Sequence, residues 1–146
     1  MIRMGHFSTE EQDRILHTIA LAENQTSGEI RIVVEKRCKS DVMSRATHYF
    51  NKLGMDQTSL RNGVLIYVAT EDHEFAIIGD QGINKLVPSD FWENTKNKML
   101  LYFKSGNIVE GIIEGVSHAG KQLRTYFPVS DDDINELPDD IIFGYD

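Results

Sequence analysis

The chain has 146 residues, a single cysteine and a formal net charge of −8. This length fits one domain with a sizeable core. Clustered basic charge is missing from the sequence, which argues against a nucleic-acid surface, and no stretch is long and apolar enough to span a membrane. Cys38 cannot form an intrachain disulfide, and the first residues lack the apolar segment of a signal peptide, so the sequence predicts a cytoplasmic protein.

The negative charge is concentrated at the C-terminal end. All charged side chains of residues 129–146 are acidic: Asp131, Asp132, Asp133, Glu136, Asp139, Asp140 and Asp146. We therefore divide the chain into a folded domain, residues 1–128, and an acidic tail, residues 129–146. The apolar residues 141–143 predict that the tail docks on a surface, either its own or that of a protein partner.

The first half of the chain predicts two helices and a strand. Residues 8–25 carry a capping-box pattern and apolar side chains at helical spacing. Residues 29–34 form a β-branched run that is typical of an interior strand. A second helix is predicted to start at Ser40 or Asp41 and to end at Gly54.

The second half predicts a strand pair followed by two helices. Residues 64–69 and 75–78 are apolar runs separated by a polar turn. One helix is predicted to start at Ser89 or Asp90 and the next at Asn107. Gly111 and Gly115 lie four residues apart on the last helix, a spacing that indicates close backbone packing.

This order of elements predicts the fold class. The first two strands are joined through a helix and should be parallel, whereas a short turn makes the third strand antiparallel. We therefore expect an α/β fold, a single-domain α/β/α sandwich in which a small mixed sheet has helices on both faces.

The predicted strand directions bring several polar residues to one edge of the sheet. Glu29 starts the first strand, Arg61 and Asn62 precede the second, and Asp80 follows the third. Hard cations such as Ca²⁺ bind mixed oxygen ligands, so Glu29, Asn62 and Asp80 are candidate metal ligands. The glycines of the neighbouring loops allow backbone oxygens to approach: Gly28, Gly79 and Gly82. Arg61 either faces an anion or neutralises one of the two acids.

The opposite edge is a second candidate. It collects Asp41 and Asp72, and ligands of α/β sheets usually bind at the carboxyl ends of parallel strands. Lys36 and Arg37 lie at the same edge, however, and a charged hairpin turn is usually only solvated.

Three stretches together resemble the TPM domain family: "TSGEIRIVVE", "RNGVLIYVATEDHEFAIIGDQGI" and "FKSGNIVEGIIEGV". The resemblance covers about residues 7–127. It matches Gly28-Glu29, Asn62-Gly63, Asp72 and the glycine-rich loop at residues 79–82. Many members read Gly-Tyr-Gly followed by Leu-Glu in that loop, whereas this chain carries Asp80 there.

The resemblance implies an α/β/α sandwich, divalent-metal binding with Ca²⁺ in particular, and a weak acid-phosphatase activity. It places the chain in a cytoplasmic bacterial branch, because many other members carry an export signal and a membrane anchor. The leading hypothesis is a Ca²⁺-binding protein with its site at Glu29, Asn62 and Asp80. The alternatives are metal-assisted hydrolysis of phosphate monoesters at the same edge and a protein-interaction module without catalysis.

Overall fold

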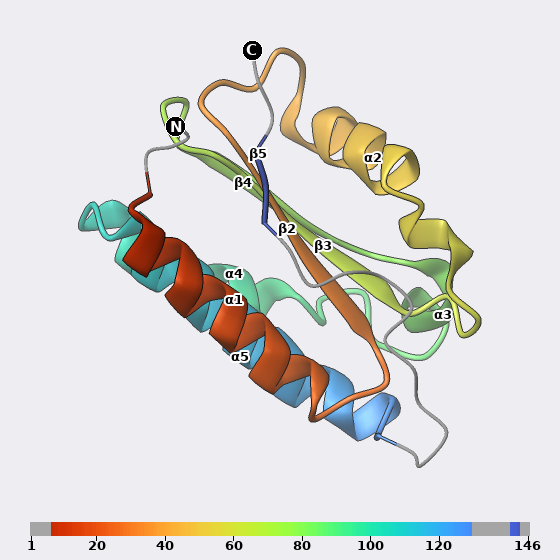
Figure 1. The fold of residues 1–146 in the computed structure, drawn as a ribbon. Helices are drawn as coiled ribbons and strands as arrows, with labels where there is room; N and C mark the ends of the chain where they lie inside the picture. Colours follow the sequence, from red (N-terminus) through yellow and green to blue (C-terminus); the bar gives the residue numbers. More distant parts are fainter. Residues whose placement is uncertain (1–6, 130–140, 144–146) are drawn as a thin grey trace.

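A four-stranded sheet forms the middle layer of the protein, with helices on both of its faces (Figure 1). The computed structural model describes residues 7–129 and 141–143. The elements in chain order are α1 (Thr9–Glu23), β2 (Glu29–Glu35), α2 (Val42–Lys52), the 3₁₀ turn η1 (Met55–Gln57), β3 (Gly63–Ala69), β4 (Glu74–Gly79), α3 (Gln81–Asn84), α4 (Glu93–Lys104), α5 (Ile108–Tyr126) and β5 (Ile141–Phe143). The predicted α/β/α sandwich with a mixed sheet is confirmed.

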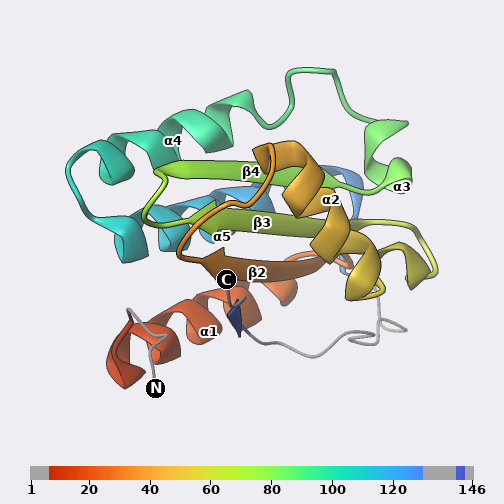
Figure 2. The ribbon, with the colours of Figure 1, turned by 90° about the horizontal axis from the view of Figure 1, so that it is seen from above.

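The strand order is β4-β3-β2-β5 (Figure 2). β2 and β3 are parallel, with Glu29 opposite Gly63, and β3 and β4 are antiparallel. Every residue of β2 and β3 is buried, as the nearly continuous apolar runs predict for interior strands. This arrangement brings the start of β2, the start of β3 and the end of β4 to the same edge of the sheet.

Two apolar clusters hold the layers together. One lies between the sheet and α1, α4 and α5, and includes Ile19, Ile32 and Ile112. The other lies between the sheet and α2, and includes Val33, Phe50 and Tyr67. Side chains alternate along a strand, so Glu29 and Glu35 share the α2 side of β2 with Val33.

The structure differs from the predicted elements at two places between β4 and α4. The loop after β4 contains the short helix α3, whose N-cap is Asp80. α4 begins at Glu93 rather than directly after Ser89 or Asp90, because turn bonds from Phe91 to Pro88 and from Glu93 to Asp90 come first. Asn107 does precede α5, but its side chain makes no capping hydrogen bond.

Val129 is the first residue of the acidic tail, and residues 130–140 and 144–146 lie outside the described residues. Residues 141–143 form β5, which pairs in parallel with β2 through Ile32 and Ile141. Ile141 is buried in the cluster formed with α1 and α5. The apolar end of the tail therefore docks on the chain's own sheet.

Candidate functional site

The amino-terminal edge of the sheet brings together the residues that the sequence predicts as metal ligands. The amino-terminal edge consists of Glu29 at the start of β2, Arg61 and Asn62 just before β3, and Asp80 just after β4. Glu29 lies opposite Gly63, and the backbone N–H of Asp80 donates to the carbonyl oxygen of Gly63 at 2.9 Å. Glu29, Asn62 and Asp80 are all buried. Residues that are far apart in the sequence thus converge as predicted.

Asp80 is held by Arg61. The Nε atom of Arg61 donates to Oδ2 of Asp80 at 2.8 Å, and Nη2 donates to Oδ1 at 3.2 Å. Oδ1 also accepts the N–H of Gln81 at 2.8 Å and so caps α3. The hydrogen bonds that Arg61 donates to Asp80, together with the negative charges of Asp80 and Asp56, raise the pKa of Arg61. Of the two predicted roles of Arg61, the structure shows the neutralisation of an acid.

Arg61 is placed by an unusual backbone conformation. Its φ angle is 53°, in the left-handed region that L-residues with a side chain rarely adopt. Its carbonyl oxygen accepts the N–H of Gly82 at 2.8 Å, and its N–H donates to Thr58 at 3.2 Å. Strained conformations of this kind concentrate at functional sites and switch regions. The side chain of Arg61 remains 38% exposed, whereas that of Asp80 is 7% exposed.

The three predicted loop glycines allow close packing at this edge. A Cβ at Gly82 would collide with the carbonyl oxygen of Leu60, so α3 can lie directly on the loop before β3 only with glycine there. A Cβ at Gly28 would lie 3.2 Å from the carbonyl oxygen of Asn62. The carbonyl oxygen of Gly79 accepts a hydrogen bond from Asn84 at 3.1 Å.

Asp56 is a further acid at this edge that the sequence did not single out. It belongs to η1 and lies near enough to Arg61 to raise the pKa of that side chain. A signal existed in the sequence, because Asp56 lies only five positions before Arg61. Its approach depends on the turn from Gly54 to Gln57, which the sequence did not predict.

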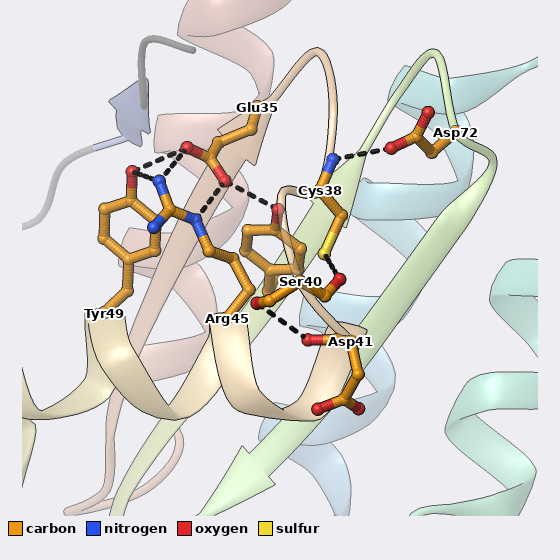
Figure 3. A network of polar contacts seen from close by, with 8 residues as sticks. Glu35, Cys38, Ser40, Asp41, Arg45, Tyr49 and Asp72 are labelled. Atoms are coloured by element: carbon orange, nitrogen blue, oxygen red, sulfur yellow. Dashed lines mark hydrogen bonds and ion pairs between the residues drawn. The ribbon is translucent and has the colours of Figure 1, made fainter.

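The opposite edge of the sheet, where β2 and β3 end, is its carboxyl-terminal edge. It holds a different arrangement of polar side chains (Figure 3). The carboxylate of Glu35 accepts hydrogen bonds from Arg45 at 2.8 and 2.9 Å, from Tyr49 at 2.8 Å and from Tyr67 at 2.6 Å. Glu35 is buried, and its side chain is completely inaccessible to solvent. Four donors therefore satisfy one buried carboxylate.

The ionisation of this cluster follows from its geometry. Burial acts to raise the pKa of Glu35, but the hydrogen bonds from Arg45, Tyr67 and Tyr49 outweigh it and hold that pKa below its ordinary value. Burial and the bond to Glu35 raise the pKa of Tyr49 to about 12. The same two causes raise the pKa of Tyr67, and the bond to Glu35 raises that of Arg45. Glu35 is thus an anion paired with a cation.

The two acids predicted as a second metal edge each bind backbone groups. Asp41 is the N-cap of α2 and accepts the N–H groups of Met43 and Ser44 at 3.2 and 3.1 Å. Asp72 accepts the N–H of Cys38 at 2.6 Å. In Figure 3 the carboxylate of Asp72 points toward the backbone of Cys38, whereas that of Asp41 points away from it. That Asp41 and Asp72 bind a metal ion stays a prediction.

The donor chemistry of the amino-terminal edge fits a hard divalent cation, because carboxylate and amide oxygens dominate it. As arranged, residues 7–129 and 141–143 contain no group of three or more histidine, cysteine or acidic side chains that could hold a metal ion. At this edge both carboxylate oxygens of Asp80 accept hydrogen bonds from Arg61.

The fold and its two polar edges define a class of small α/β/α domains. The family model of the TPM domain matches residues 3–122, and the chain belongs to that family. None of the helices in the described ranges is long and apolar enough to cross a membrane.

Solved structures agree with this assignment. The chain is 48% identical to the BA42 protein from the psychrophilic bacterium Bizionia argentinensis, with a TM-score of 0.91 over 96% of this chain and 97% of that one. The fold is also shared with the N-terminal domain of the cg2496 protein from Corynebacterium glutamicum, at 10% identity and a TM-score of 0.65 over 94% and 81% of the two chains. An N-terminal domain from P. gingivalis has 17% identity and a TM-score of 0.70 over 84% and 80%. No curated protein matches the sequence.

Proposed function

We propose that the protein binds a divalent cation, with Ca²⁺ as the preferred ion, at the amino-terminal edge of its sheet. The observation that supports this proposal is the convergence of Glu29, Asn62 and Asp80 from three separate segments at a buried, oxygen-rich edge. Oxygen ligands of mixed charge are what Ca²⁺ requires. The family resemblance implies the same ion.

Arg61 has a defined role in this proposal. Its guanidinium neutralises Asp80 when no cation is bound, which stabilises a buried carboxylate that would otherwise lack a counter-charge. The guanidinium is partly exposed, so it can turn toward solvent without opening the core. Glu29, Asn62 and Asp80 would then hold the cation, and Asp56 would add negative charge nearby. Ca²⁺ binding and the Arg61–Asp80 ion pair should therefore compete.

Calorimetric Ca²⁺ titrations of two variants test this competition. Asp80→Asn should weaken binding on the order of tenfold, because Ca²⁺ affinity follows the charge of the ligands. Asparagine is also a good N-cap, so α3 should persist. Arg61→Gln should tighten binding about threefold or more, because the competing cation is removed.

Asp72→Asn is the matched control at the opposite edge. Its side-chain oxygen can still accept the N–H of Cys38, so the fold should be unchanged. Ca²⁺ affinity should stay at the wild-type value in this variant. A loss of affinity in Asp72→Asn with none in Asp80→Asn would move the site to the opposite edge and contradict the proposal.

Metal-assisted hydrolysis of phosphate monoesters is the catalytic alternative at the same edge. It requires the cation to bind first, so the binding variants also test it. Glu29→Gln and Asp80→Asn should then reduce the hydrolysis of a generic phosphate ester. Equal rates for wild type and both variants would rule out catalysis at this edge.

A cytoplasmic location also belongs to the proposal. Cys38 is a free cysteine, which suits a reducing compartment. Fractionation of cells that produce the protein should recover it with cytoplasmic markers, and recovery with envelope fractions would contradict this location.

A further inference from the structure

A cavity of about 370 Å³ opens at the carboxyl end of β3, between the β3–β4 turn and the junction of α4 and α5. This volume lies in the range of small-molecule sites. The cavity is at the edge opposite to Glu29 and Asp80, so it is separate from the proposed cation site. Ligands of α/β sheets commonly bind beyond the carboxyl ends of parallel strands, which is where this cavity lies.

The interior of the cavity is mainly apolar. Phe75, Leu100, Phe103 and Ile108 line it. The rings of Phe75 and Phe103 meet edge to face, with 5.0 Å between their centroids, which fixes the orientation of both. Leu100 is 38% exposed although it lines a concave surface. An apolar group that entered the cavity would remove this surface from water.

Besides the imidazole of His73, the lining of the cavity carries one carboxylate and one ammonium group. Glu74 starts β4 and Lys104 ends α4, and both line the cavity. Across the described ranges, neither side chain forms an ion pair with another residue. A ligand with a single charge would meet one favourable and one unfavourable partner here. A ligand that carries both charges would find a partner for each.

We propose that this cavity binds a small zwitterion with an apolar body, of the class of apolar α-amino acids. The apolar body would pack against Phe75 and Phe103, the carboxylate would face Lys104, and the ammonium group would face Glu74. The proposal is independent of cation binding.

Three probes with closely similar aromatic bodies test the proposal by amide chemical-shift titration of the whole protein. L-phenylalanine carries both charges. 3-Phenylpropanoate carries only the negative charge, and 2-phenylethylamine carries only the positive charge. L-phenylalanine should shift the amides of residues 68–75 and 100–108. Each singly charged probe should bind about two- to fivefold more weakly, because one exposed ion pair is lost.

Two exposed substitutions assign the charges. Lys104→Gln should remove the preference for L-phenylalanine over 2-phenylethylamine, and Glu74→Gln should remove the preference over 3-phenylpropanoate. Lys98→Gln, a change on the same helix but outside the cavity lining, should leave all three affinities unchanged.

Two results would overturn the inference. One is the absence of shifts in residues 68–75 and 100–108 at millimolar L-phenylalanine. The other is equal affinity for all three probes, which would mean that the cavity recognises only the apolar body, as it would a side chain of a protein partner.

Discussion

At the scale of single residues, the two buried acids at opposite edges of the sheet are held differently. Glu35 receives four hydrogen bonds and is closed to solvent. Asp80 is held by Arg61, whose side chain is 38% exposed and can therefore turn into solvent if the ion pair separates. A carboxylate with a removable partner can bind a ligand, whereas a carboxylate with fixed partners stabilises the fold. We therefore propose a structural role for Glu35 and a cation-binding role for Asp80.

Replacement of Glu35 by glutamine should destabilise the protein by about 3 kcal/mol, because Arg45 would lose its counter-charge in a largely buried position. Urea unfolding measures this change. The exposed pair of Arg37 and Glu71 supplies the control, since Glu71→Gln should cost no more than about 1 kcal/mol. Similar losses for both variants would contradict the structural role of Glu35.

The effect of Glu35→Gln should depend on pH. The pKa of Glu35 is lowered in the folded chain from its ordinary value of 4.5. The stability that this carboxylate supplies is therefore fully present above about pH 4.5 and is lost as the pH falls through the lower, folded-state pKa. The gap in unfolding free energy between wild type and Glu35→Gln should narrow in that acidic range, and a gap that stays constant would be inconsistent with this linkage.

At the scale of elements, glycines set the distance between packed helices. A Cβ at Gly115 would lie 2.5 Å from Sδ of Met99, and a Cβ at Gly120 would lie 2.8 Å from Cβ of Ala22. Both values are too short for real contacts. The predicted close approach at Gly111 and Gly115 is confirmed, because α4 supplies the atoms that a side chain at either position would meet.

The two contacts should respond differently to alanine. The Met99 side chain can change its rotamer, whereas the Cβ of Ala22 moves only with the backbone of α1. Gly120→Ala should therefore destabilise the protein by about 1–3 kcal/mol. Both variants gain about 1 kcal/mol of helix propensity. Gly115→Ala should cost less, because the Met99 side chain can move away and relieve the crowding there. Thermal unfolding compares them, and a larger loss for Gly115→Ala would contradict this packing argument.

The short strand β5 should contribute measurably to stability. Ile141 is 6% exposed and packs in the cluster with α1 and α5. Ile141→Ala should cost about 2 kcal/mol or more through lost burial. Val129→Ala, at a position that is 49% exposed, should change the unfolding free energy by less than about 0.5 kcal/mol. Equal effects in denaturant unfolding would mean that β5 does not stabilise the domain.

At the scale of the whole molecule, the order of helices and strands carried enough information to predict the layers. The apolar runs of β2 and β3 and the short turn before β4 determine the strand directions, and these place Glu29, Asn62 and Asp80 at one edge. Local hydrogen bonding was harder to predict. The helix α3 spans only Gln81–Asn84, too few residues for a helical pattern to be visible.

The polar network of Glu35 was missed for a related reason. Its donors come from α2 and β3, and Arg45 and Tyr49 lie one helical turn apart on α2. That spacing was visible in the sequence, but it became informative only once Glu35 was placed on the same side of the sheet as α2. Side-chain partners across elements depend on the packing of layers, which the sequence pattern does not specify.

The most direct test of cation binding is an amide chemical-shift titration of the wild-type protein with Ca²⁺, recorded beside Asp80→Asn. We expect saturable shifts at residues 28–29, 61–63 and 79–84 in the wild type, and their loss in Asp80→Asn. Residues 38–41 and 70–73 at the opposite edge should not shift in either protein. Shifts confined to that opposite edge, or wild-type shifts that persist unchanged in Asp80→Asn, would contradict a cation site at the amino-terminal edge.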